Sequence, residues 1–242
     1  GSMTSGDLVS GQLGEGLDFD GSNDFLINQD HPYLAEYTVS AWTNYSNLDT
    51  SIGRIISKRS PDAEADYRET NYILDIDDTT DRARLTNVSS GGTIVTSTGL
   101  TDVQGTGWNL VTGRYDGSNQ RLATNGSTQD TDSAAAPNSS NVNDNDFRIG
   151  NSAYDGSGGF TGQIDEVRIA SISRANAWVD AEYTNQNSPT TFYTAAANGA
   201  GGSTVTWDGG GADNDWETAL NWSGDAVPTD TDDVVIDTAV FV

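Results

Sequence analysis

The chain has 242 residues, no cysteine, and a formal net charge of −25 that comes from 11 basic and 36 acidic residues. Such an acidic chain is not expected to bind nucleic acid or an anionic membrane, because both need cationic side chains that neutralise phosphate. Without cysteine, neither disulfides nor thiol chemistry is possible. No apolar run is long enough to span a membrane, so we expect no membrane insertion.

The first three residues, Gly-Ser-Met, are typical of the remnant of a cleaved tag. We interpret residues 1–7 as this remnant followed by a linker, and the chain as a piece of a longer exported protein. Neutral sugars, cations and basic surfaces are the partners that its charge favours.

Short runs of β-branched and aromatic residues recur along the chain, separated by clusters of Gly, Asn, Asp and Ser. This regular spacing predicts an all-β fold, an antiparallel β-sandwich or jelly roll. The predicted strands are residues 16–27, 37–45, 54–58, 72–77, 83–88, 93–96, 108–115, 121–125, 147–149 and 162–169. Two turn-prone clusters, at 89–92 and 116–119, are expected to join neighbouring strands as hairpins.

One short helix is expected after the last long strand. Ser173 is suited to cap residues 174–186, where apolar side chains recur at helical spacing. We expect Trp178 to pack this helix onto the sandwich, and Trp42 to belong to the core.

The composition changes at residue 194. Residues 194–203 are rich in Gly and Ala and read as a linker. Residues 204–242 carry nine acidic and no basic side chains, but their three tryptophans argue against disorder. We therefore expect a domain at residues 8–193, and then a β-rich segment that is the truncated start of a further module.

Four segments carry a family resemblance when they are taken in order: "GLDFDGSNDFLIN", "YTVSAWTNY", "WNLVTGRYDGSNQRLATNG" and "GQIDEVRIASISRANAWVDAEY". Together they resemble the laminin-G-like, concanavalin A-like jelly-roll domains of bacterial secreted and surface proteins. The resemblance covers roughly residues 8–187 and implies two packed antiparallel sheets whose first and last long strands are neighbours. Two residues depart from the family pattern: Ala123 stands where such domains often carry an aromatic residue, and Gly113 interrupts a strand that is normally apolar. Residues 205–237 are similar to segments that open repeat modules of large bacterial surface proteins.

An acidic pair, Asp165 and Glu166, lies inside the last predicted strand, where a buried charge needs a partner. If this strand lies beside the first one, Asp20 and Asp165 could converge and share a cation, and oxygen ligands favour Ca²⁺. The alternative is that the pair binds Arg168 or Arg148, or accepts hydrogen bonds from backbone N–H groups in turns.

The family resemblance also implies a structural calcium ion near the terminal strands. The implied ligands are Asp20, the carbonyl of Gly21 and Asp165, with Asn23 and Asp24 as further candidates.

Glycan binding would need an exposed aromatic ring beside polar groups. The four tyrosines that lie in or beside polar stretches are the candidates: Tyr45, Tyr67, Tyr72 and Tyr154. They are equally compatible with a structural role.

Catalysis is the competing hypothesis. Asp75 and Asp77 lie on one side of a predicted strand, as a glycoside hydrolase requires, but the Glu, Asp and Glu pattern of sandwich glycosidases is absent. The only histidine, His31, has no evident catalytic partner.

We therefore expect a non-catalytic carbohydrate-binding or adhesion module, monomeric as an isolated domain, from a secreted or cell-surface protein. A passive spacer domain is the first alternative, and a glycoside hydrolase or polysaccharide lyase is the second.

Overall fold

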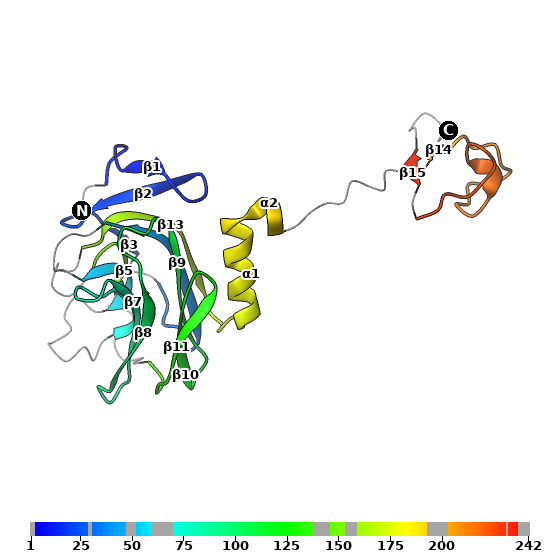
Figure 1. Cartoon of the computed structure of the whole chain (residues 1–242). Coiled ribbons are helices and arrows are strands. Elements are labelled where there is room, and N and C mark those ends of the chain that lie inside the picture. Colours follow the sequence, from blue (N-terminus) through cyan, green and yellow to red (C-terminus); the bar gives the residue numbers. More distant parts are fainter. Residues whose placement is uncertain are drawn as a thin grey trace. The chain divides into compact units, whose positions relative to one another are not determined.

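The computed structural model describes residues 3–28, 31–46, 52–59, 70–137, 146–152, 159–192, 203–230 and 232–236. The chain forms two compact units, Gly1–Pro189 and Thr190–Val242. In the first unit, two antiparallel sheets lie face to face as a β-sandwich (Figure 1). The predicted all-β jelly-roll class is confirmed.

The two sheets are named sheet A and sheet B. In spatial order, the strands of sheet A are β1 (Leu8–Ser10), β2 (Glu15–Asp20), β13 (Thr161–Ala170), β4 (Tyr37–Tyr45), β9 (Asn109–Tyr115), β10 (Asn119–Thr124) and β11 (Ser127–Ser133). Those of sheet B are β3 (Leu26–Asn28), β12 (Asp146–Ile149), β5 (Gly53–Arg59), β6 (Thr70–Ile76), β7 (Arg82–Val88) and β8 (Ile94–Asp102).

The strand order agrees with the connections expected from the sequence. The first and last long strands, β2 and β13, are antiparallel neighbours. The turn at 116–119 joins β9 to β10, where the Asp116 carboxylate accepts hydrogen bonds from the backbone N–H groups of Ser118 (3.0 Å) and Asn119 (2.7 Å). The turn at 89–92 joins β7 to β8. Both predicted hairpins are therefore present.

The core lies between the two sheets and follows the alternation of the strands. In β4, Tyr37, Val39, Ala41 and Tyr45 point into the core, while Trp42 points to the outer face of sheet A. Gly113 lies where the sheets approach each other closely, because a Cβ atom there would come within 2.7 Å of the Leu85 side chain. The small residue is thus a packing requirement.

Helix α1 (Asn176–Asn187) covers part of the outer face of sheet A (Figure 1). Its contact with the sheet is made by Trp42, which is fully buried, lies 5.7 Å from the Tyr183 ring centroid and donates a hydrogen bond to the Gln186 side chain. One expectation is wrong here, because the N-cap is Ala175 rather than Ser173. Trp178 is 37% exposed, and the Arg174 guanidinium lies over its ring.

The boundary between the two units falls within helix α2 (Pro189–Phe192). The second unit also contains the parallel strands β14 (Thr204–Thr206) and β15 (Asp233–Val235) and the short 3-10 helix η1 (Ala219–Asn221). Its small core is built from Val205, Trp207 and Trp222. No helix in the described part of the chain is long and apolar enough to cross a membrane.

Candidate functional site

The candidate site lies on the outer face of sheet B, which its central strands line with polar side chains. In β6, Tyr72, Leu74 and Ile76 point into the core, so Ile73 and Asp75 point outward. The same alternation in β7 turns Arg84 and Thr86 outward, because Ala83 and Leu85 are core residues. The sequence alternation therefore sets which side chains reach this face.

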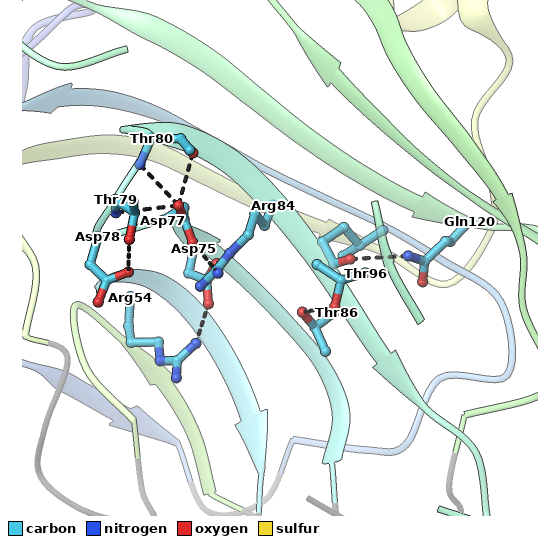
Figure 2. Close-up of polar contacts among 11 residues, drawn as sticks. Arg54, Asp75, Asp77, Asp78, Thr79, Thr80, Arg84, Thr86, Thr96 and Gln120 are labelled. Atoms are coloured by element: carbon cyan, nitrogen blue, oxygen red, sulfur yellow. Dashed lines mark hydrogen bonds and ion pairs between the residues drawn. The ribbon is translucent and has the colours of Figure 1, made fainter. Parts of the chain in front are cut away.

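Three neighbouring strands bring together a row of charges. Asp75 lies opposite Arg54 of β5 and opposite Arg84 of β7 in the sheet register. Arg84 Nε donates to Asp75 Oδ1 at 2.8 Å, and Arg54 Nη1 donates to Asp75 Oδ2 (Figure 2). Asp75 is 1% exposed, so its charge depends on these two guanidinium groups for compensation.

Arg84 extends the network to Asp77, just beyond the end of β6 (Figure 2). Burial raises the pKa of Asp77, but hydrogen bonds from Thr80 and the charge of Arg84 outweigh burial, so the pKa is lowered. Burial likewise lowers the pKa of Arg84, but attraction to Asp75 and Asp77 outweighs it and raises the pKa. Asp77 and Arg84 are therefore both ionised at neutral pH.

This network argues against the glycoside hydrolase alternative. Arg84 donates hydrogen bonds to both carboxylates of the candidate pair, Asp75 and Asp77. A general acid needs a raised pKa so that it carries a proton at neutral pH, whereas the pKa of Asp77 is lowered. The pair is thus arranged for ion pairing with arginine.

A cavity of about 250 Å³ opens over this network. The side chains that line it combine charged, hydroxyl and aliphatic groups: Ile52, Arg54, Ile73, Asp75, Arg84, Thr86, Ile94 and Thr96. The hydroxyls of Thr86 and Thr96 lie 3.1 Å apart across β7 and β8 (Figure 2). Such a surface offers hydrogen bonds and apolar contact to an uncharged polar ligand.

The strands beneath the cavity are tied to sheet A from inside the core. The Gln120 side chain of β10 donates hydrogen bonds to the Leu85 carbonyl (3.0 Å) and to the Ser97 hydroxyl (2.9 Å). Figure 2 shows Gln120 reaching toward β7 and β8 from the opposite side of the sheet. This link fixes the strands that carry the two threonines.

The structure does not bring the two principal calcium candidates together. Asp20 lies opposite Thr161 in the β2 and β13 pair, and Asp165 is four residues further along β13, about 13 Å at the rise of a strand. The convergence expected of Asp20 and Asp165 is therefore wrong. In the described residues, no group of three or more His, Cys, Asp or Glu side chains is placed to hold a metal ion.

The other calcium candidates belong to the turn after β2. Asp20 Oδ1 accepts hydrogen bonds from the backbone N–H groups of Ser22 (2.8 Å) and Asn23 (3.2 Å), and Asp24 Oδ2 accepts one from Asp20 N (3.1 Å). Gly21 has φ of +78°, as the turn requires. These carboxylates are engaged in shaping the turn, and calcium binding stays a prediction from the sequence.

Asp165 and Glu166 have separate partners. Asp165 Oδ2 accepts a hydrogen bond from the backbone N–H of Leu13 at 2.9 Å, which ties the β1 and β2 hairpin to β13. Glu166 has φ of +51° and is the extra residue of a β-bulge. Its carboxylate binds Arg168 at 2.5 Å, and Arg168 also binds Glu182 of α1 at 2.8 Å. Turn capping and arginine pairing thus account for the acidic pair.

The candidate tyrosines do not provide a stacking platform in the described residues. Tyr45 and Tyr72 are 1% and 0% exposed and belong to the core, so neither ring is open to a ligand. Asn44 and Asn71, the polar residues that precede them in β4 and β6, lie on the opposite face of the same strands. Tyr67 and Tyr154 lie outside the described residues.

Sequence reasoning missed Arg54, Arg84, Thr86 and Thr96 as site residues. The alternating pattern "RARLT" of residues 82–86 was a usable signal, because it places Arg84 and Thr86 on one face. Which strands flank β7 was not available from that pattern.

Two sheets that enclose one core, with a polar cavity on the outer face of sheet B, define a β-sandwich module of the kind that binds ligands. The chain belongs to the Laminin_G_3 family, described as the concanavalin A-like lectin/glucanases superfamily, whose model matches residues 19–179. No curated protein sequence matches the chain.

Several solved structures share the fold at low sequence identity. The Ruminococcus gnavus IT-sialidase CBM40 bound to α2,3 sialyllactose is 15% identical, with a TM-score of 0.56 over 69% of this chain and 96% of that one. Domain 4 of AbnA, an extracellular arabinanase from Geobacillus stearothermophilus, in complex with arabinotriose, is 16% identical, with a TM-score of 0.57 over 72% and 78%.

The binding domain of Paraclostridial Mosquitocidal Protein 1 is 12% identical, with a TM-score of 0.58 over 76% of this chain. The match spans 47% of that longer chain. By their descriptions, these three structures are a CBM of a sialidase, a domain of an arabinanase and the binding domain of a mosquitocidal protein.

Proposed function

We propose that the sandwich is a non-catalytic carbohydrate-binding module that holds a neutral glycan in the cavity over β6, β7 and β8. The observation that carries this proposal is the composition of the cavity: two arginines whose charges are balanced by Asp75 and the neighbouring Asp77, two hydroxyls and three isoleucines. The hydroxyl groups of a neutral sugar can accept hydrogen bonds from such groups and donate hydrogen bonds to them, and they add no charge to the cavity.

The charge balance favours a neutral glycan over an acidic one at this cavity. Arg54 and Arg84 face Asp75 and Asp77, so an anionic ligand would have to compete with carboxylates already in place. The same ion pairs disfavour hydrolysis at this cavity, because arginine side chains bind both Asp75 and Asp77.

The structural neighbours support the same class of function. Two of them are glycan-binding modules by their descriptions, and one of these comes from an extracellular enzyme. By analogy of fold, we propose that this module acts outside the cell in a larger exported protein, where it mediates attachment to a glycan. The calcium ion expected from the sequence is not needed for this proposal.

An array of neutral and acidic oligosaccharides tests the proposal. We expect the wild type to bind a neutral oligosaccharide, and Thr86→Val to weaken this binding at least tenfold, because it removes a hydroxyl while keeping the side-chain shape. Thr131→Val, an exposed position on β11 of sheet A, is the matched control and should bind as the wild type does. Incubation with the bound oligosaccharide should produce no new reducing ends.

Each opposite outcome supports a different alternative. Absence of binding to any glycan would favour a spacer domain. New reducing ends would favour a glycoside hydrolase. Binding that survives Thr86→Val would place the glycan elsewhere on the module.

A further inference from the structure

A second cavity, of about 300 Å³, lies on the outer face of sheet A beside the start of α1. Its lining comes from β4, from β13, from the segment before α1 and from the first turn of α1: Thr38, Ser40, Arg168, Ile169, Ala170, Arg174 and Trp178. It lies on the other sheet from the proposed glycan site. We name it the Arg174 cavity.

The Arg174 cavity is held in place by the fold. Ser40 pairs with Arg168, and Thr38 with Ala170, so the floor is a regular part of the β4 and β13 ladder. The Thr38 hydroxyl donates to the carbonyl of Ile172 (2.8 Å) and accepts from the backbone N–H of Arg174 (2.9 Å). The segment that forms the wall is thereby fixed to the floor.

Arg174 is the cation of this cavity that forms no ion pair in the described part of the chain, although the Glu182 carboxylate is near enough to attract its charge. In the part of the chain that the structure describes, no carboxylate lies within ion-pair distance of its guanidinium group, and its Nε is buried without a hydrogen-bond partner. The guanidinium lies 4.8 Å above the Trp178 ring, a contact that orients it without neutralising its charge. Arg174 is therefore positioned to receive an anion.

Neighbouring charges add to this preference. Arg114 is 1% exposed, has no ion pair among the described residues, and donates to the Arg174 carbonyl at 2.8 Å. Arg168 is paired with Glu166 and Glu182. Arg114 and Arg174 are thus linked by this hydrogen bond, and neither side chain has an ion pair among the described residues.

We propose that the Arg174 cavity binds the carboxylate of a small organic acid of about the size of one sugar acid. The planar guanidinium can donate two parallel hydrogen bonds to a carboxylate. The cavity volume is at the small end of the range for ligand sites, which suits a single residue rather than a long chain. The Ser40 hydroxyl and the exposed part of Trp178 would contact the remainder of the ligand.

Calorimetric titration of the whole chain with sodium glucuronate tests this proposal, with the methyl ester of glucuronate as the neutral control. We expect one glucuronate per chain and at least tenfold weaker binding of the ester. Arg174→Met should weaken glucuronate binding at least tenfold, about 1.4 kcal/mol, because it keeps the apolar stem but removes charge and donors.

Arg82→Met is the matched control, since it changes the net charge equally but lies on β7 of sheet B, outside both cavities. It should leave glucuronate binding unchanged. The proposal is overturned if the wild type gives no binding heat, if the ester binds equally, or if binding survives Arg174→Met. Loss of glucuronate binding in Thr86→Val would instead assign the acid to the neutral-glycan cavity, which keeps the two proposals separable.

Discussion

Replacing Asp75 by asparagine would test whether the buried charge row holds sheet B together. The substitution keeps the size of the side chain and one acceptor oxygen, but it removes the negative charge. Arg54 would lose its only carboxylate partner among the described residues, while Arg84 would keep Asp77. The row would then contain two guanidinium groups on either side of a neutral amide.

The size of the effect follows from burial. The side chains of Asp75 and Arg54 are 1% and 7% exposed, so water replaces little of the lost interaction. Removing one partner of a buried pair costs about 3–5 kcal/mol, and the retained Arg84 to Asp77 contact places the expectation at about 3 kcal/mol. For a domain of this size that corresponds to a decrease in Tm of about 6–12 °C.

Urea unfolding at neutral pH, followed by far-ultraviolet circular dichroism, gives the free energy of unfolding of each variant. Asp116→Asn is the control, because its ion pair with Arg121 joins side chains that are 29% and 26% exposed. We expect this control to cost less than about 1 kcal/mol. If Asp75→Asn costs no more than Asp116→Asn, the charge row does not stabilise the sheet and the reasoning fails.

Two further predictions concern pH and calcium. The folded-state pKa of Asp77 lies below its usual value of 3.8, so the ionised carboxylate should stabilise the fold above about pH 4 and lose this effect as the pH falls through the folded pKa. The difference in free energy of unfolding between the wild type and Asp77→Asn should therefore be smaller at about pH 3 than at about pH 6. An equal difference at the two pH values would contradict this prediction. Because the Asp165 carboxylate accepts a hydrogen bond from the backbone N–H of Leu13, Asp165→Asn should lower Tm both with calcium and with a chelator. The change in Tm between calcium and chelator should be the same in the variant and in the wild type. A calcium effect that is present in the wild type and absent in Asp165→Asn would instead make Asp165 a calcium ligand.

Local patterns sufficed for most strands and for both hairpins, but not for side-chain partners. The predicted strand 16–27 is wrong, because it consists of β2 and β3 in different sheets, and β1 and β11 were not predicted. The alternation in residues 37–45 predicts a strand, and the Asp116 turn predicts a hairpin, because both depend on neighbours in sequence. The partners of Asp75 come from strands on either side of β6, so they depend on the sheet register. Sequence reasoning could place the carboxylate on a face but could not assign its arginines.

Tertiary contacts also explain the errors at the helix and the tyrosines. The segment before α1 is fixed by the hydrogen bonds of Thr38 to Ile172 and Arg174, so the helix begins later than a local cap at Ser173 would allow. Tyr45 and Tyr72 have polar neighbours in sequence, but both rings turn inward from strands. Burial depends on the opposing sheet, which local composition does not report.

The bulge at Glu166 shifts by one residue the alternation of inward and outward side chains along β13. Ile164 points into the core, and one extra residue later Val167 and Ile169 also contact it, although a regular strand would turn those two outward and Arg168 inward. The spacing of three residues between Ile164 and Val167 thus lets both side chains face the core across the bulge. A relative without the extra residue would need the opposite order of polar and apolar side chains after this point to bury the same face.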